Sequence, residues 1–64
     1  MKFISFNLTD NRGKIAIKKD DIICVEDNEH YCKVSIYNCS EEYFIKVTDK
    51  YSDILEELNK EYIF

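Results

Sequence analysis

The stretch that decides the fold is IICVEDNEHYCKVSIY, residues 22–37. Apolar and polar side chains alternate on both sides of the polar segment 27–30, and a period of two indicates half-buried strands. The stretch therefore predicts a β-hairpin with strands over 22–26 and 31–37. With 27–30 as the loop, Val25 lies opposite Cys32. The core face predicted by this register consists of Ile23, Val25, Cys32, Val34 and Ile36.

The same alternation continues on both sides of this hairpin. It predicts strands over 2–8, 14–17 and 43–47, with the turn-forming residues 9–13 between the first two. Gly13, the only glycine of the chain, stands where this turn requires a positive φ.

From residue 48 the apolar period changes from two to 3.6, which predicts a helix over 49–61. Its apolar stripe consists of Tyr51, Ile54, Leu55, Leu58 and Tyr62. Thr48 or Asp49 is the expected N-cap. The predicted fold class is therefore α+β: a small, mainly antiparallel sheet of four to five strands with one C-terminal amphipathic helix.

The size and composition of the chain indicate one small folded domain. A chain of 64 residues buries only about 60% of the surface that it exposes when unfolded, so we expect at least a homodimer. A content of 45% apolar residues with no proline is atypical of a disordered segment. There is no run of about 18 apolar residues and no secretory signal, so we expect no membrane segment. Three cysteines, an odd number, predict free thiols and a cytoplasmic location.

The charge is distributed unevenly along the chain, whose net charge is −4. Residues 1–19 carry five bases and one acid, a net charge of +4, whereas residues 20–64 carry four bases and twelve acids, a net charge of −8. DNA-binding proteins gain most of their affinity by neutralising phosphates, so DNA is not the expected main partner. The basic residues of a candidate anion-binding edge are Arg12, Lys14, Lys18, Lys19 and Lys33.

The reactive residue types do not form a recognisable catalytic or metal-binding motif. Cys24, His30, Cys32 and Cys39 are of the types that bind zinc, but no Cys-x-x-Cys pair occurs. The predicted hairpin also places Cys24 and Cys32 on opposite faces. A cysteine nucleophile needs a base and an orienting group, and no third group accompanies His30. We therefore predict no metal, no cofactor and no enzymatic activity.

Two groups of apolar side chains indicate binding. Residues 62–64 continue the helical stripe and then pass beyond it, so they either close the core of the monomer or form a partner surface. Aromatic residues on the polar side of the sheet are suited to stacking on bases or to packing across a dimer, and Phe44 shares this pattern. The candidate partner or oligomer interface consists of Phe3, Tyr31, Tyr37, Tyr62, Ile63 and Phe64.

The order of the segments resembles that of two protein families. The matching segments are Gly13–Ile17, Asp21–Glu26, Tyr31–Val34 and Glu42–Val47, followed by an acidic amphipathic helix. Over most of the chain this order resembles the flagellar and swarming-motility FlbD/SwrD-like small proteins, which implies a link to motility. The segments Asp21–Glu26 and Tyr31–Val34 also resemble the first two-thirds of a LytTR-type DNA-binding domain. The basic recognition segment of that family has no counterpart in this sequence.

Three functional hypotheses follow. The leading one is a non-enzymatic interaction protein that acts as a homo-oligomer and regulates or inhibits a protein partner. Its size and acidity are typical of phage or mobile-element inhibitors of host proteins. The first alternative is a protein that binds a small molecule or nucleotide at a subunit interface, through Lys18, Lys19, Lys33 and the tyrosines. The second is a LytTR-like nucleic-acid-binding regulator that uses the edge over residues 12–19.

Overall fold

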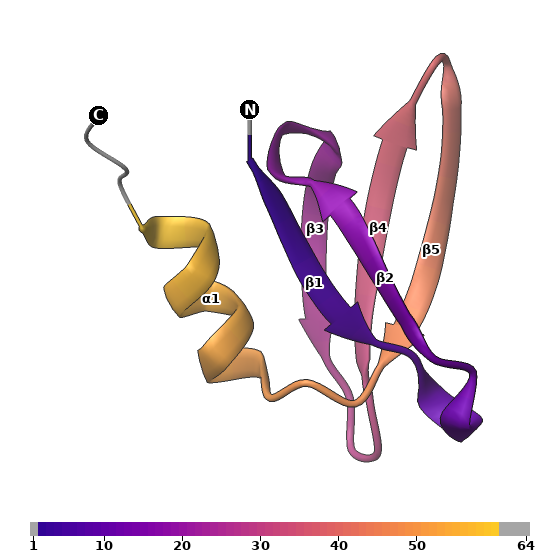
Figure 1. The fold of residues 1–64 in the computed structure, drawn as a ribbon, viewed down its shortest axis with the longest axis vertical. Helices are drawn as coiled ribbons and strands as arrows, with labels where there is room; N and C mark the ends of the chain where they lie inside the picture. The colour runs from indigo at the N-terminus through magenta and orange to yellow at the C-terminus, as the bar shows by residue number, and fades with distance from the viewer. Residues whose placement is uncertain (1, 61–64) are drawn as a thin grey trace.

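The computed structural model describes residues 2–60. The strands of this part are β1 (Phe3–Asn7), β2 (Lys14–Lys18), β3 (Ile22–Asp27), β4 (Cys32–Asn38) and β5 (Glu41–Val47), and the helix is α1 (Tyr51–Asn59; Figure 1). Short 3-10 turns, Thr9–Asn11 and Lys19–Asp21, follow β1 and β2. The predicted α+β fold class, with five antiparallel strands before one helix, is confirmed.

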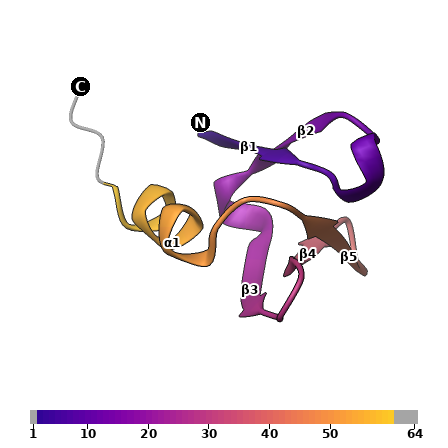
Figure 2. The same cartoon turned by 90° about the horizontal axis from the view of Figure 1, so that it is seen from below.

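The strands form two antiparallel sheets. β1 pairs with β2, and β3, β4 and β5 form a three-stranded meander. The sheets meet where β1 and β5 end: Leu8 and Val47 form an isolated bridge, and the Thr48 N–H donates to the Asn7 carbonyl at 2.9 Å. Figure 2 shows the β1–β2 hairpin as one layer over the meander, with α1 beside them.

The core lies between these two layers. Buried residues alternate with exposed ones along β1 and with half-buried ones from Cys32 to Ile36 in β4, as expected for strands with one face against a core. The buried side chains are Ile4, Phe6, Ile17, Cys32, Val34, Ile36, Val47 and Ile54. Ile54 is the residue that α1 contributes to this core, so it anchors the helix beside the two layers. Burial of a large apolar side chain contributes about 1.5–3 kcal/mol, and this cluster holds the layers together.

The β3–β4 hairpin has a different register from the predicted one. Val25 pairs with Val34 and Asp27 with Cys32, so the loop is 28–31 rather than 27–30. The loop is closed by a backbone hydrogen bond of 2.9 Å between its first and last residues. A register shift of two residues leaves every side chain on its predicted face, and Val25 therefore still packs against the core.

A β-bulge in β3 changes the face of one predicted core residue. Ile22 pairs with Ile36 and Cys24 with Ser35, which leaves Ile23 as an extra residue between them. Ile22 packs against the core, whereas Ile23 is exposed. The prediction that Ile23 lies on the core face was wrong, because a strict period of two cannot accommodate the inserted residue.

The start of α1 also differs from the prediction. Its N-cap is Lys50, which makes no side-chain capping hydrogen bond, rather than Thr48 or Asp49. Asp49 instead accepts hydrogen bonds from Asn7, at 2.7 Å from the backbone N–H and 3.3 Å from the side-chain amide. The predicted last residue of the helix, 61, lies outside the described residues. No helix between residues 2 and 60 has the length and apolarity needed to cross a bilayer.

Two turns use backbone conformations that favour glycine. Gly13 has a φ of 98°, which confirms the predicted reason for a glycine there. The β4–β5 turn has only two central residues, Cys39 and Ser40, with φ values of 52° and 67°. Two successive positive φ values correspond to a type I′ turn, in which asparagine and glycine are preferred. This turn is therefore strained by its own sequence.

Candidate functional site

One face of the meander turns away from the core and carries exposed apolar side chains. Tyr37 on β4 and Phe44 on β5 are 50% and 51% exposed, and Ile23 at the bulge is 54% exposed. Cys24 and Ser35, which pair with one another, lie between them. These five residues form the outer face. No helix or strand of the described chain covers it in Figure 2.

Charged residues lie at the two ends of the outer face. The register places Lys33 opposite Lys46 at one end, and Tyr37 opposite Glu42 at the other. Glu26, opposite Lys33 on β3, adds one negative charge to the lysine end. The outer face therefore has a basic end at Lys33 and Lys46, Phe44 in the middle, and an acidic end where Glu42 lies beside Tyr37.

Two lysines of the outer surface lie over aromatic rings. Lys33 Nζ is 4.5 Å from the centroid of the Phe44 ring, and Lys46 Nζ is 5.0 Å from that of Tyr31. Such contacts contribute about 0.5–1 kcal/mol when exposed, so they favour one orientation of each ring without removing it from solvent.

The residues predicted as an interface fall in separate places. Tyr37 belongs to the outer face, and Tyr31 lies beside its basic end. Phe3 is 59% exposed but lies on β1, in the other layer. Residues 62–64 lie outside the described residues. The outer face therefore brings together only part of the predicted set.

The residues predicted as a basic edge are also dispersed. Arg12 precedes β2, which begins at Lys14 and ends at Lys18, and Lys19 follows it. The four residue steps from Lys14 to Lys18 span about 13 Å of extended chain. Lys33 is on β4, over an aromatic ring. These five cations do not form one cluster.

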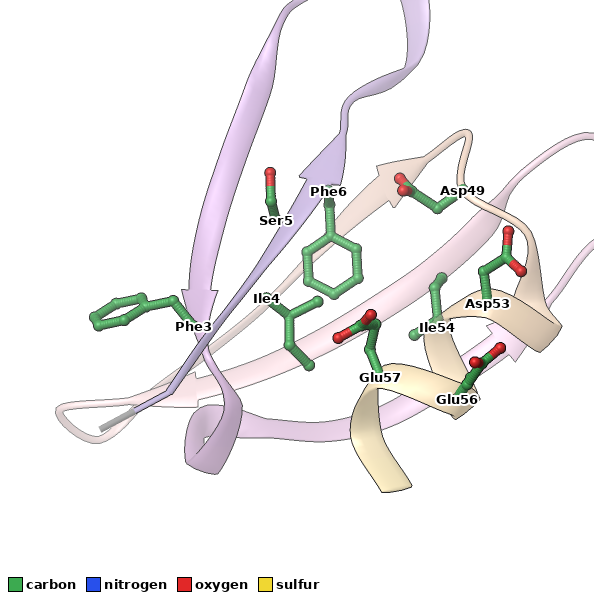
Figure 3. A pocket seen from close by; sticks show the side chains of 9 residues that line it. All are labelled: Phe3, Ile4, Ser5, Phe6, Asp49, Asp53, Ile54, Glu56 and Glu57. Carbon is green, nitrogen blue, oxygen red and sulfur yellow. The ribbon is translucent and has the colours of Figure 1, made fainter. Parts of the chain in front are cut away.

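A second surface feature is a groove of about 430 Å³ between β1 and α1 (Figure 3). Its floor is formed by the buried side chains of Ile4, Phe6 and Ile54. Asp53 and Glu56 line its helical side and are exposed. The volume is within the range of about 300–1,000 Å³ usual for ligand clefts, and the groove combines an apolar floor with an acidic wall.

The carboxylates of this groove differ in their surroundings. Asp49 is bonded to Asn7, and Glu57 accepts a hydrogen bond from Lys60 at 2.7 Å. That hydrogen bond raises the pKa of Lys60. Asp53 and Glu56 form no ion pair with any residue from 2 to 60. Asp53 and Glu56 are therefore the exposed carboxylates of the groove without an ion pair within residues 2–60, although Glu56 also interacts electrostatically with Lys60.

Lys2, which precedes β1, interacts electrostatically with Glu57, one of the residues that line the groove. Burial, followed by the nearby Lys19 ammonium, lowers the pKa of Lys2, while Glu57 acts in the opposite direction. Lys19 Nζ also donates to the Lys60 carbonyl at 3.3 Å. Lys2 and Lys60 therefore place positive charge near Glu57 in the wall of the groove.

The three cysteines lie in three different environments. Cys24 and Cys39 are exposed, whereas Cys32 is buried, which confirms the predicted separation of Cys24 and Cys32. The Cys32 thiol contacts an Asp27 carboxylate oxygen at 4.0 Å. Burial raises the pKa of this thiol, and the charges of Asp27 and Asp49 raise it further. Cys32 is therefore held in its neutral, poorly nucleophilic form.

Sequence reasoning missed the β1–α1 groove. The spacing of Asp53 and Glu56, three residues apart beside the buried Ile54, was visible in the sequence, but nothing there showed that this side of the helix faces β1. No group of three or more His, Cys, Asp or Glu side chains within residues 2–60 is arranged to hold a metal ion. Comparison of the chain with protein-family models, curated proteins and solved structures gives no match.

Proposed function

We propose that the protein is a non-enzymatic interaction module that forms a homodimer through the outer face and regulates or inhibits a protein partner. The observation that carries this proposal is the group of half-exposed apolar side chains, Ile23, Tyr37 and Phe44, on one uncovered sheet face. A contiguous exposed apolar surface on a small protein is typical of an interaction site. A chain of this length also gains stability when a second molecule covers its exposed apolar surface, because its own core is small.

The charges around the outer face favour a second copy of the same chain. In a face-to-face dimer with a two-fold axis running across the strands, the two sheets point in opposite directions. The basic end of one copy, Lys33 and Lys46, then lies over the acidic end of the other, at Glu42. A closed two-fold interface of this kind uses the same patch twice.

Phe44 supplies a measurable share of the dimer energy. Complete burial of a phenylalanine contributes about 1.5–3 kcal/mol, and about half of this residue is still exposed in the subunit. The dimer therefore gains about 1 kcal/mol from each of its two Phe44 rings. Phe44→Ala is expected to raise the dimer Kd about 30-fold, which corresponds to about 2 kcal/mol.

Sedimentation equilibrium of the full chain tests this expectation. The matched control is Tyr43→Ala, because Tyr43 is the adjacent residue, is 43% exposed and points to the other face of β5. The control should leave the dimer Kd unchanged within a factor of about two. A wild-type chain that stays monomeric at high concentration would refute the proposed dimer. Equal effects of the two substitutions on the dimer Kd would show that the outer face is not the interface.

Residues 62–64 are a second proposed contribution to self-association, on the basis of their apolar sequence alone. A chain that ends at residue 61 is expected to dimerise more weakly than the full chain. An unchanged sedimentation profile would show that these residues neither form part of the dimer interface nor stabilise the dimer.

A further inference from the structure

The edge of β1 that faces away from β2 has unpaired backbone groups. Lys19 N–H bonds the carbonyl of Lys2, and Leu8 N–H bonds that of Gly13, so the even-numbered residues of β1 point their backbone groups toward β2. In an antiparallel pair these groups alternate in direction. The N–H and C=O groups of Phe3 and Ser5 therefore point to the opposite edge, where the described chain supplies no partner.

The chain itself closes this edge at one end. The next outward-pointing residue is Asn7, whose N–H donates to Asp49 and whose carbonyl accepts from the Thr48 N–H. The segment leading into α1 thus pairs with β1 for one residue and then diverges from it. The divergence opens the β1–α1 groove beside Phe3 and Ser5 (Figure 3).

The geometry points to an occupant for this groove. We infer that an extended basic segment of a partner protein adds to the free edge of β1 as an additional strand and lies between β1 and α1. This inference rests on the proposed function as a protein-binding module, and it names the class of partner. An added strand obtains its affinity from main-chain hydrogen bonds and its specificity from alternate side chains.

Two properties of the groove select the chemistry of the segment. Its floor of Ile4, Phe6 and Ile54 favours apolar side chains at alternate positions. Asp53 and Glu56, which form no ion pair within residues 2–60, favour lysine or arginine along the helical side. An acidic segment would place like charges together and is expected to be rejected.

The probe is a short synthetic peptide of alternating valine and lysine, and the control peptide replaces lysine with glutamate. We expect the first peptide to bind the full chain at low salt and the second not to bind. Exposed charges are screened by salt, so the affinity should fall as the salt concentration rises. In nitrogen-edited NMR spectra, the amides of Phe3 and Ser5 should become protected from exchange with solvent upon binding.

A pair of proline substitutions separates strand pairing from nonspecific charge attraction. Ser5→Pro removes an outward N–H without removing a bond to β2, and edge strands tolerate proline in this position. Ala16→Pro is the matched control, because Ala16 is the Cα partner of Ser5 and its N–H points to the far edge of β2. Ser5→Pro should weaken peptide binding about tenfold or more, and Ala16→Pro should have no effect.

Charge reversal provides a test that does not depend on the backbone. Asp53→Lys with Glu56→Lys should weaken binding of the lysine peptide by about tenfold and allow binding of the glutamate peptide. Glu41→Lys, at an exposed residue of β5, is the control and should change neither affinity.

Three results would overturn the inference: no binding of the lysine peptide at low salt, equal effects of the two proline variants, or protection at an edge other than that of β1. Sedimentation of the same samples distinguishes this failure from that of the proposed function. Intact dimerisation without peptide binding would refute the groove alone. Peptide binding by a strictly monomeric chain would refute the dimer alone.

Discussion

The contact between Asp49 and β1 provides a direct measure of how the segment before α1 is attached to the sheets. The Asp49 carboxylate accepts a 2.7 Å hydrogen bond from the Asn7 N–H and a second one, at 3.3 Å, from its side-chain amide. Hydrogen bonds to charged groups contribute about 1.5–3 kcal/mol, and the exposure of this pair places it at the lower end. Loss of these hydrogen bonds in Asp49→Ala is therefore expected to lower the free energy of unfolding by about 1.5 kcal/mol, apart from any effect on the helix dipole.

A control is needed because Asp49 also lies near the N-terminus of α1. Its charge favours the helix dipole, an effect of about 0.3–1 kcal/mol that Asp53 in the first turn shares. Asp53→Ala removes that effect without removing any hydrogen bond to β1. The difference between the two variants isolates the contact with Asn7.

Urea denaturation at one fixed protein concentration is the appropriate assay, since self-association makes stability depend on concentration. We expect Asp49→Ala to be less stable than Asp53→Ala by about 1.5 kcal/mol. In a domain of this size, that difference lowers the melting temperature by about 6–12 °C. Equal stability of the two variants, within about 0.5 kcal/mol, would refute the contact as a structural link.

Two further predictions concern the turn between β4 and β5 and the buried thiol. Ser40→Gly should raise the free energy of unfolding by about 0.5–1 kcal/mol in urea denaturation. The substitution relieves the left-handed strain at φ 67°, and the added entropy of the unfolded chain offsets only part of this gain. A loss of stability would contradict the type I′ assignment. The pKa of Cys32 is raised in the folded state above its ordinary value of 9.0, so the folded state binds this proton more tightly than the unfolded state. The resulting stabilisation is fully present below about pH 9 and is lost as the pH rises through the folded-state pKa. Cys32→Ala should therefore flatten the alkaline decrease in stability relative to wild type, and parallel pH profiles would argue against this origin.

The strands were predictable because their alternation is dictated by one buried face. Each predicted strand end lies within two residues of the observed one, as in 31–37 against Cys32–Asn38 and 43–47 against Glu41–Val47. The register error in the β3–β4 hairpin was harmless, since a shift of two residues preserves the faces. The bulge at Ile23 was not predictable, because the apolar pair Ile22 and Ile23 fits either strand phase equally well.

The candidate sites were predictable only in part, because they depend on contacts between distant segments. Tyr37 was identified from its place on the polar side of a strand, and its exposure follows from that place. The groove depends on Asp49 bonding Asn7, 42 residues away, instead of capping its own helix. Local sequence strongly favours the cap for an aspartate in this position, and a tertiary contact overrides it.

The outer face and the β1–α1 groove lie on different sides of the meander, and this placement determines how the two proposals combine. The register places the outer face on the side of the meander opposite its core face, whereas the groove is lined by residues of β1 and α1. A dimer built on the outer face therefore leaves both grooves open, and we expect two peptides to bind per dimer. A partner with two suitably spaced basic segments would then gain avidity without any new contact. Saturating peptide should leave the dimer Kd unchanged, whereas a peptide-dependent Kd would show that the two surfaces are thermodynamically coupled.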